Sequence, residues 1–174
     1  MFDKILGDCI YICDLSGKGY DSDIILKDRY SLLWAYNSKL ELLWNAECNT
    51  GHYPYAYDVD GDQKDELIMG YTLFDNDGKK LWTYEMQLPN LTLRGTGSAA
   101  YEAGGFFLGT ADGKVAVIVK NNGQVAWEQS IYTPTGGNEF TRMADVDMTP
   151  LILGDNLFVA SYNGNLVSME LRSG

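Results

Sequence analysis

This chain is organised around the stretch Asp58-Val59-Asp60-Gly61-Asp62-Gln63-Lys64-Asp65-Glu66, which is followed at once by Leu67-Ile68-Met69-Gly70-Tyr71. An acidic loop leads directly into an apolar strand, and carboxylates occupy positions 1, 3, 5 and 9 of the loop. Calcium takes about six to eight oxygen ligands at roughly 2.3–2.6 Å, and alternate residues of a tight loop supply them. We therefore predict a Ca2+ site with side-chain ligands from Asp58, Asp60, Asp62 and Glu66 and the backbone carbonyl of Lys64.

Position 6 of this loop departs from the usual pattern of calcium-binding loops. The chain turns sharply there, which favours Gly, but this sequence has Gln63. We expect the change to weaken the site without abolishing it, and the alternative interpretation is a solvated acidic turn that binds no ion. An earlier loop, residues 14–20, has the same outline with Lys18 in the place of a third carboxylate. An ammonium group there would replace the ion.

The same order of turn and strand recurs along the chain. Turn signals such as Asp77-Gly78 and Asn122-Gly123 supply the positive φ that tight hairpins need, and each precedes a strand with a tryptophan. The three tryptophans of this pattern, Trp44, Trp82 and Trp127, lie 38 and 45 residues apart. A repeat of about 40–45 residues with several strands is typical of a β-propeller blade. We therefore predict an all-β fold, a β-propeller with four blades of four antiparallel strands.

The expected blades make the whole chain, residues 1–174, a single propeller domain or half-domain. We place them at about residues 9–47, 53–87, 97–131 and 148–171. Blade four stops at Gly174 without an outer strand, and Met1–Leu6, within a closing segment 1–8, has no other partner. We therefore expect Met1–Leu6 to supply the missing strand.

Composition excludes several classes of protein. The 174 residues are 45% hydrophobic and 13% aromatic, which suits a folded core. The formal charge of −11 argues against binding to nucleic acid or to anionic membranes, and no apolar run is long enough for a membrane span. Residues 1–4 do not resemble a signal peptide, so we expect a cytoplasmic protein if the chain is expressed as it stands. Three cysteines without zinc spacing are expected to be free thiols.

Residues from about 9 to 85 resemble the eight-bladed propeller of bacterial rhamnogalacturonan lyases. The resemblance is carried by Asp14-Leu15-Ser16-Gly17-Lys18-Gly19-Tyr20, by Asp23-Ile24-Ile25-Leu26-Lys27-Asp28-Arg29-Tyr30, by Gly51-His52-Tyr53-Pro54-Tyr55-Ala56-Tyr57-Asp58 and by the acidic loop itself. A calcium-dependent lyase needs a base and a cation beside the substrate carboxylate. The candidate groups for such chemistry are His52, Tyr53, Lys27 and Arg29.

Residues from about 88 to 174 resemble the BamB family, the propeller lipoproteins of the outer-membrane β-barrel assembly machinery, which are also eight-bladed. The segments are Leu91-Thr92-Leu93-Arg94-Gly95, Asp145-Val146-Asp147-Met148-Thr149-Pro150, Ala160-Ser161-Tyr162-Asn163-Gly164-Asn165-Leu166 and Leu171-Arg172-Ser173-Gly174. The resemblance implies a docking surface for a partner domain of this machinery. Its residues would be Leu91, Leu93, Arg94, Asp145 and Asp147, and the alternative is that they only brace the top of the blades.

The seam between the two resemblances falls near Gln87-Leu88-Pro89, so residues 9–87 would be two lyase-like blades and residues 88–174 two BamB-like blades. Both resembled families are extracellular or periplasmic. Two half-propellers in one short chain suggest a designed chimera, with a natural fusion as the alternative. We therefore predict a non-enzymatic, calcium-binding scaffold without a natural activity. The alternatives are a protein-binding module that keeps the assembly partner surface, and the remnant of a calcium-dependent rhamnogalacturonan lyase.

Ring closure leads to a prediction about assembly. Blades from eight-bladed rings each turn by about 45°, so four of them leave two open ends. Exposed sheet edges favour pairing with another chain. We expect a homodimer with a twofold axis, in which Met1–Leu6 of each copy completes blade four of the other. A strained four-bladed monomer is the alternative.

Overall fold

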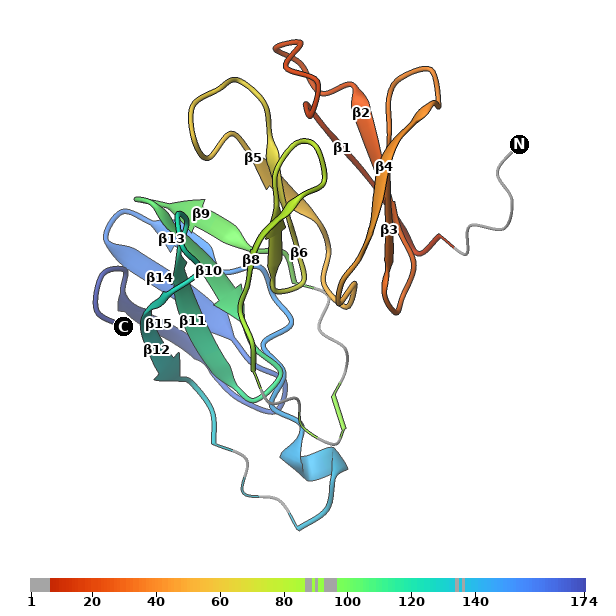
Figure 1. Cartoon of the computed structure of the whole chain (residues 1–174). Coiled ribbons are helices and arrows are strands. Elements are labelled where there is room, and N and C mark those ends of the chain that lie inside the picture. The colour runs from red at the N-terminus through yellow and green to blue at the C-terminus, as the bar shows by residue number, and fades with distance from the viewer. Residues whose placement is uncertain (1–6, 87–88, 90, 93–96, 134, 136) are drawn as a thin grey trace. The chain divides into compact units, whose positions relative to one another are not determined.

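Short antiparallel strands joined by tight turns form this chain (Figure 1). The structure is a computed structural model, and it describes residues 7–86, 89, 91–92, 97–133, 135 and 137–174. Within these residues there are fifteen strands in four sheets and a short 3-10 helix, η1 (Phe140–Arg142). The all-β class and the four antiparallel sheets confirm the fold class predicted from the sequence.

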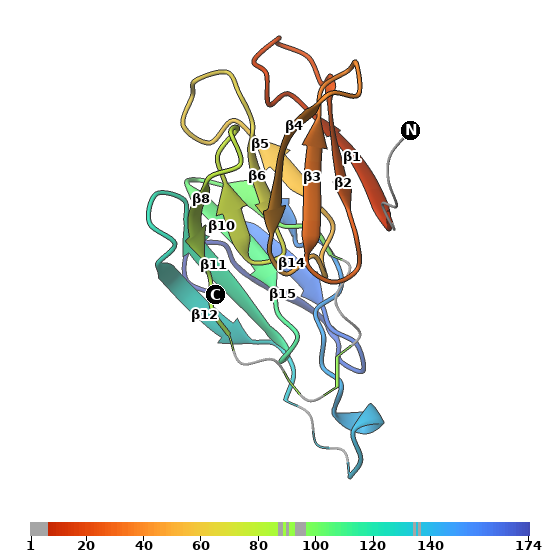
Figure 2. The same cartoon turned by 45° about the vertical axis from the view of Figure 1, so that its right-hand side comes forward.

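The first two sheets each contain four strands in the order of the sequence. The first consists of β1 (Cys9–Cys13), β2 (Asp23–Lys27), β3 (Leu32–Tyr36) and β4 (Leu42–Glu47). The second consists of β5 (Tyr55–Tyr57), β6 (Glu66–Met69), β7 (Thr72–Phe74) and β8 (Lys80–Thr83). Neighbouring strands are antiparallel throughout, and Figure 2 shows β2, β3 and β4 side by side. The first sheet begins at Cys9 and ends at Glu47, the bounds expected for blade one.

The third and fourth sheets repeat this plan with one difference. The third consists of β9 (Ala100–Glu102), β10 (Gly105–Gly109), β11 (Lys114–Val119) and β12 (Val125–Ser130). The fourth has only β13 (Leu151–Leu153), β14 (Asn156–Ala160) and β15 (Leu166–Glu170). Among the described residues, the last sheet therefore lacks an outer strand, as expected. Met1–Leu6, which we expect to fill that place, lie outside the described residues.

The chain divides into two compact units, the first ending at Thr83 and the second beginning at Tyr84. This boundary lies close to the predicted seam at Gln87-Leu88-Pro89, of which only Pro89 is described. The predicted seam was defined by resemblance to two families, and a division into compact units does not test that resemblance. The assignment of residues 9–87 and 88–174 to two different families therefore stays a prediction.

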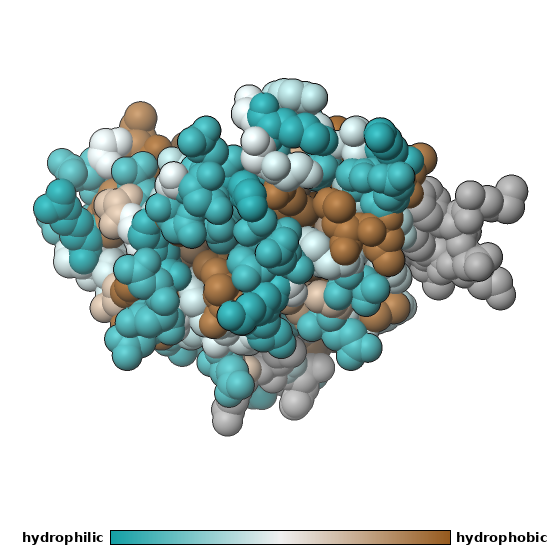
Figure 3. All heavy atoms as spheres, turned by 45° about the horizontal axis from the view of Figure 1, so that its top comes forward, coloured by the Kyte–Doolittle hydropathy of each residue, from teal (hydrophilic) through white to brown (hydrophobic). Residues whose placement is uncertain are grey.

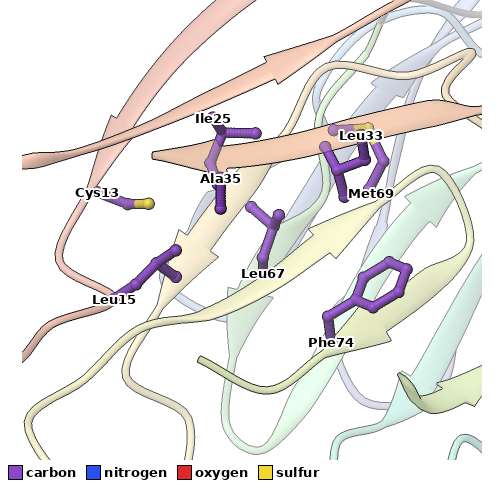
Figure 4. Packing of buried hydrophobic residues seen from close by; sticks show 8 residues of the cluster. All are labelled: Cys13, Leu15, Ile25, Leu33, Ala35, Leu67, Met69 and Phe74. Carbon is purple, nitrogen blue, oxygen red and sulfur yellow. The ribbon is translucent and has the colours of Figure 1, made fainter. Parts of the chain in front are cut away.

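Each unit has a core in which two sheets pack face to face. In the first unit, apolar residues of the first sheet meet those of β6 and β7 from the second (Figure 4). The cluster consists of Cys13, Leu15, Ile25, Leu33, Ala35, Leu67, Met69 and Phe74. In the second unit, the third and fourth sheets share a cluster of Phe107, Val115, Val117, Val146, Leu157, Val159 and Leu171. Burial of this apolar area is the main favourable term in the folding of each unit.

A tryptophan joins the two sheets in both units. The indole Nε1 of Trp44, on β4, donates to the backbone carbonyl of Asn76 at 2.9 Å. Gly78 lies flat against this ring: a Cβ there would stand 2.5 Å from it, and the φ of +80° also requires Gly. In the second unit, the Nε1 of Trp127 donates to the carbonyl of Leu171 at 3.3 Å. These contacts give a physical reason for two members of the tryptophan repeat.

Candidate calcium loop and docking surface

The acidic loop between β5 and β6 brings together three of the four predicted side-chain ligands. Carboxylate oxygens of Asp58, Asp60 and Glu66 all lie within 4.8 Å of one another, which is close enough for a single cation to contact all three. Asp62 is not part of this group, and its Oδ1 accepts the backbone N–H of Lys64 at 2.8 Å. A role for the Lys64 carbonyl stays a prediction.

Backbone hydrogen bonds to the first ligand fold the loop. Asp58 Oδ1 accepts the N–H of Gly61 at 2.7 Å, and its Oδ2 accepts the N–H of Gln63 at 3.0 Å. Gly61 has a φ of +89° and Gln63 one of +70°. The second value is costly for a residue with a side chain. Gln63 therefore adopts the left-handed backbone conformation that favours Gly at position 6 of such loops, as expected from the sequence.

Glu66 lies at the base of the loop as the first residue of β6, and it is only 5% exposed. Its Oε2 accepts the backbone N–H of Val59 at 2.8 Å. Burial, followed by the negative charges of Asp60, Asp62 and Asp58, raises the pKa of this carboxyl to about 7. Burial penalises a charged group that has no partner of opposite charge. Among the ion pairs formed by the described residues, none involves Glu66.

The first sheet carries the same arrangement with a cation built in. Asp23 is the first residue of β2, as Glu66 is of β6, and it is fully buried. Its Oδ2 accepts the backbone N–H of Ser16 at 2.8 Å, and its Oδ1 lies 3.8 Å from the Nζ of Lys18. The ammonium of Lys18 thus lies near the buried carboxylate, and its replacement of an ion stays a prediction. The role of Asp23 was missed, because nothing in its local sequence marks it as the counterpart of Glu66.

Two residues that a lyase would need are engaged in structural contacts. The buried Nζ of Lys27 lies 3.0 Å from Asp8 Oδ2 and donates to the carbonyl of Thr50 at 2.9 Å. Arg29 Nε donates to the other oxygen of Asp8 at 2.7 Å. Both cations therefore fasten the segment before β1 to the end of β2. The ring of His52, a third candidate, packs edge-on against Tyr71 with the centroids 4.8 Å apart.

The predicted docking residues fall into three groups. Leu91 and Asp147 are half-buried, and Leu93 and Arg94 lie outside the described residues. Asp145 has 0% exposure, so its carboxylate is not open to a partner in this conformation. Its backbone carbonyl accepts the N–H of Tyr162 at 2.8 Å, in the turn that follows β14. This burial favours the bracing role for Asp145.

The segment before the fourth sheet is tied down by a residue that sequence reasoning did not select. Asn163 has a φ of +58°, and its Nδ2 donates to the carbonyls of Phe140 at 3.4 Å and Met143 at 3.3 Å. An Asn-Gly pair favours a tight turn, but the long-range acceptors of the Asn163 side chain could not be seen in the sequence. None of the described helices is long and apolar enough to cross a membrane.

Comparison with known proteins gives one family. The family model for the outer membrane protein assembly factor BamB matches residues 21–174. BamB of Shewanella oneidensis is 88% identical over 97 residues, which is 56% of this chain and 25% of that protein. BamB of Vibrio cholerae is 42% identical over 102 residues, 59% of this chain and 26% of that protein. The chain thus spans about a quarter of the length of these curated relatives.

Solved structures agree on the fold. The crystal structure of BamB from Moraxella catarrhalis aligns with a TM-score of 0.71 at 27% identity, covering 86% of this chain and 46% of that chain. A computationally designed protein, Ika8, aligns with a TM-score of 0.59 at 10% identity, covering 87% of this chain and 43% of that chain. The second likeness concerns the fold alone.

Proposed function

The chain belongs to the family of the outer membrane protein assembly factor BamB, and we propose that it is a protein-binding propeller module which docks on a component of outer membrane protein assembly. The observation that carries this proposal is the family match over residues 21–174, together with the high identity to BamB of Shewanella oneidensis. The relatives are named as assembly factors and not as enzymes, in agreement with the prediction of a non-enzymatic protein. The protein-binding alternative is thus better supported than an inactive scaffold.

The docking surface that we propose centres on Leu91 and Asp147, with Leu93 and Arg94 included from the sequence. Leucine and arginine side chains close together in the sequence suit the centre of a protein interface, where a few residues often carry much of the binding energy. Asp145 lies under this surface. Its backbone carbonyl accepts the N–H of Tyr162 and so holds the segment that carries Asp147. Asp145 therefore acts as a positioning residue in this proposal.

Calorimetric titration with the soluble domain of the β-barrel assembly partner tests the docking proposal. We expect saturable binding by the unchanged chain and at least tenfold weaker binding by Leu91→Asp, since a buried charge opposes an apolar contact. Leu81→Asp, on the exposed outer strand β8, is the matched control and should bind like the unchanged chain. Absence of binding, or equal affinity for all three proteins, would overturn the proposal.

We also propose that the loop 58–66 binds Ca2+ through Asp58, Asp60 and Glu66. The group of three carboxylates supports this, and so does the comparison with the first sheet. At the equivalent position there, the Lys18 ammonium lies 3.8 Å from the buried Asp23. A buried carboxylate at the start of the second strand thus has a nearby cation in one sheet, and a bound metal would supply one in the other.

Calcium should therefore raise the melting temperature of the chain. A ligand that binds only the folded state at a hundredfold excess over its Kd stabilises that state by about 2.7 kcal/mol. Asp60→Ala should remove most of the gain, whereas Asp77→Ala, an exposed turn residue of the same unit, should keep it. Equal melting temperatures in calcium and in chelator would refute the site.

The remaining predictions concern origin, place and assembly. The family match begins at Asp21, so it extends over most of the lyase-like half. The comparisons reported above give no support to the lyase resemblance or the chimera, and both stay hypotheses. We propose that the chain works at the site of outer membrane assembly rather than in the cytoplasm, where the N-terminal sequence alone had placed it. We further propose that it forms a homodimer, with Met1–Leu6 of each copy at the last sheet of the other.

A further inference from the structure

We infer that Gly97 and Thr149 are positioning residues of the proposed docking surface, because they fix its two chain segments against one another. The inference rests on the proposed docking function and deepens it. One segment leads from Leu91 into the third sheet, and the other carries Asp147 ahead of the fourth sheet. These segments are far apart in the sequence, so contacts between them must bring Leu91 and Asp147 into one surface.

Gly97 lets the two backbones approach more closely than a residue with a side chain would allow. It is buried, and a Cβ there would stand 2.7 Å from the carbonyl carbon and oxygen of Met148 and 2.8 Å from the carbonyl oxygen of Asp147. Carbon atoms pack best at about 3.5–4.0 Å, so a methyl group would push the segments apart. The obstacles are backbone atoms, which cannot rotate away as the end of a side chain can. Close approach therefore requires Gly at this position.

Thr149 adds a directional bond beside this close approach. Its Oγ1 accepts the backbone N–H of Ser98 at 3.0 Å. Ser98 lies two residues before β9 and Thr149 two residues before β13, so the bond joins the starts of the third and fourth sheets. A single hydrogen bond contributes only about 1 kcal/mol, but its direction fixes how the segments align. We call residues 97–98 and 147–149 together the docking junction.

The segment that carries Asp147 is fixed to the second unit on its other side as well. The backbone N–H of Val146 donates to the carbonyl of Thr110 at 3.0 Å. Gly109 also lies close to Val146, since a Cβ on this glycine would overlap the Val146 carbonyl oxygen. Because these contacts hold the residue before Asp147, the docking junction sets where Asp147 stands relative to Leu91. A surface that is organised in advance loses less conformational freedom on binding.

Apolar exposure alone does not distinguish a docking surface on this chain. Large exposed hydrophobic side chains occur on strands of all four sheets, for example Ile10, Leu81, Val125 and Leu151. Figure 3 shows hydrophobic residues reaching the surface among hydrophilic ones. Scattered apolar residues are normal on protein surfaces. Recognition of one site therefore depends on the relative placement of its groups, which the docking junction sets.

Calorimetric titration with the soluble domain of the β-barrel assembly partner tests the junction with two matched pairs of variants. Gly97→Ala should weaken binding roughly fivefold or more, because close-packed backbone transmits the shift to Asp147. Gly137→Ala, at an exposed glycine with open space for the methyl group, should bind like the unchanged chain. Thr149→Val loses the acceptor for Ser98 and should weaken binding about threefold, whereas Thr149→Ser keeps the acceptor and should bind normally.

A double-mutant cycle separates positioning from a general loss of stability. If Gly97→Ala acts by displacing Asp147, it should cost little further affinity in a chain that already carries Asp147→Ala. A merely structural effect would cost the same affinity in both backgrounds and would overturn the positioning role. Thermal unfolding checks that each variant is folded at the temperature of the titration. Thr149 is exposed, so the Thr149 pair tests the junction even where Gly97→Ala fails to fold.

The outcomes distinguish this inference from the docking proposal beneath it. Absence of binding by the unchanged chain overturns the docking function, and the positioning role with it. Binding by the unchanged chain with equal affinities within both pairs overturns the positioning role alone and leaves docking standing. Equal affinities within one pair remove that residue, Gly97 or Thr149, from the junction.

Discussion

At the scale of single residues, Asp28 shows how one carboxylate organises a turn. Its Oδ1 accepts the backbone N–H of Tyr30, Ser31 and Leu32 at 2.8–2.9 Å and the hydroxyl of Thr50 at 3.1 Å. Burial acts to raise the pKa of this carboxyl, but the backbone donors together outweigh it and lower the pKa below its usual 3.8. The turn between β2 and β3 thus depends on an ionised side chain.

Asp28→Ala should destabilise the first unit by about 2–3 kcal/mol, because it leaves several backbone donors without their acceptor. Urea unfolding measures the loss, and Asp77→Ala, an exposed carboxylate in another turn of the same unit, is the control. A loss for Asp28→Ala no larger than that of the control would contradict this account of the turn.

The charge of Asp28 also predicts a pH dependence. Its pKa is lower in the folded chain than in the unfolded one, so its contribution is complete well above pH 3.8 and is lost as the pH falls through the folded pKa. Asp28→Asn cannot ionise, so below pH 4 the stabilities of the two proteins should converge. Unfolding curves in chelator between pH 6 and pH 2.5 measure this. A constant difference across that range would show that ionisation of Asp28 is not involved.

Gln63 gives the opposite prediction, a gain in stability. Its φ of +70° strains a residue with a side chain, and Gly removes the strain at some cost in chain entropy. Gln63→Gly should therefore stabilise the fold by up to about 1 kcal/mol and tighten calcium binding. Gln63→Ala keeps the strain and is the control. Equal calcium affinities for the Gly and Ala variants would rule out strain as the cause of a weakened site.

At the scale of elements, the tryptophan contact between sheets explains the repeat seen in the sequence. The ring of Trp44 stacks on Phe74 with the centroids 6.2 Å apart and covers Gly78, while its N–H reaches Asn76. The side chain of Trp44 thus joins the outer strand of the first sheet to β7 of the second sheet and to the turn that follows β7. A blade of this kind is held to its neighbour near its outer end as well as through the apolar core.

Trp44→Ala should cost about 3 kcal/mol of stability in the first unit, because it opens a cavity between two sheets. Trp44→Phe keeps most of the packing and loses only the hydrogen bond to Asn76, so its cost should be near 1 kcal/mol. Thermal unfolding of the two variants compares these terms. Equal losses would mean that the hydrogen bond, and not the packing, joins the sheets.

The sequence predicted this level of structure well, because turns and strands are local. Gly78 and the glycine of Asn122-Gly123 mark hairpins that the structure contains, with φ of +80° and +69°. Predictions that depend on distant contacts fared differently. Asp62 is turned toward Lys64, and Asp145 is buried under the turn after β14, and neither outcome follows from local spacing. The pairing of Asp23 with Lys18 likewise depends on how the loop folds back on its strand.

At the scale of the whole molecule, the family assignment supports the proposed role in protein binding. The BamB match accounts for the propeller fold. The proposed docking surface around Leu91 and Asp147 lies in the second unit.

Native mass spectrometry of the chain mixed with the soluble domain of its β-barrel assembly partner tests the central claim, protein binding by a BamB-family module, most directly. The account predicts a species that contains the partner domain together with the chain, and the loss of this species for Leu91→Asp but not for Leu81→Asp. A spectrum in which the chain and the partner domain occur only separately, at concentrations where both are folded, would contradict it.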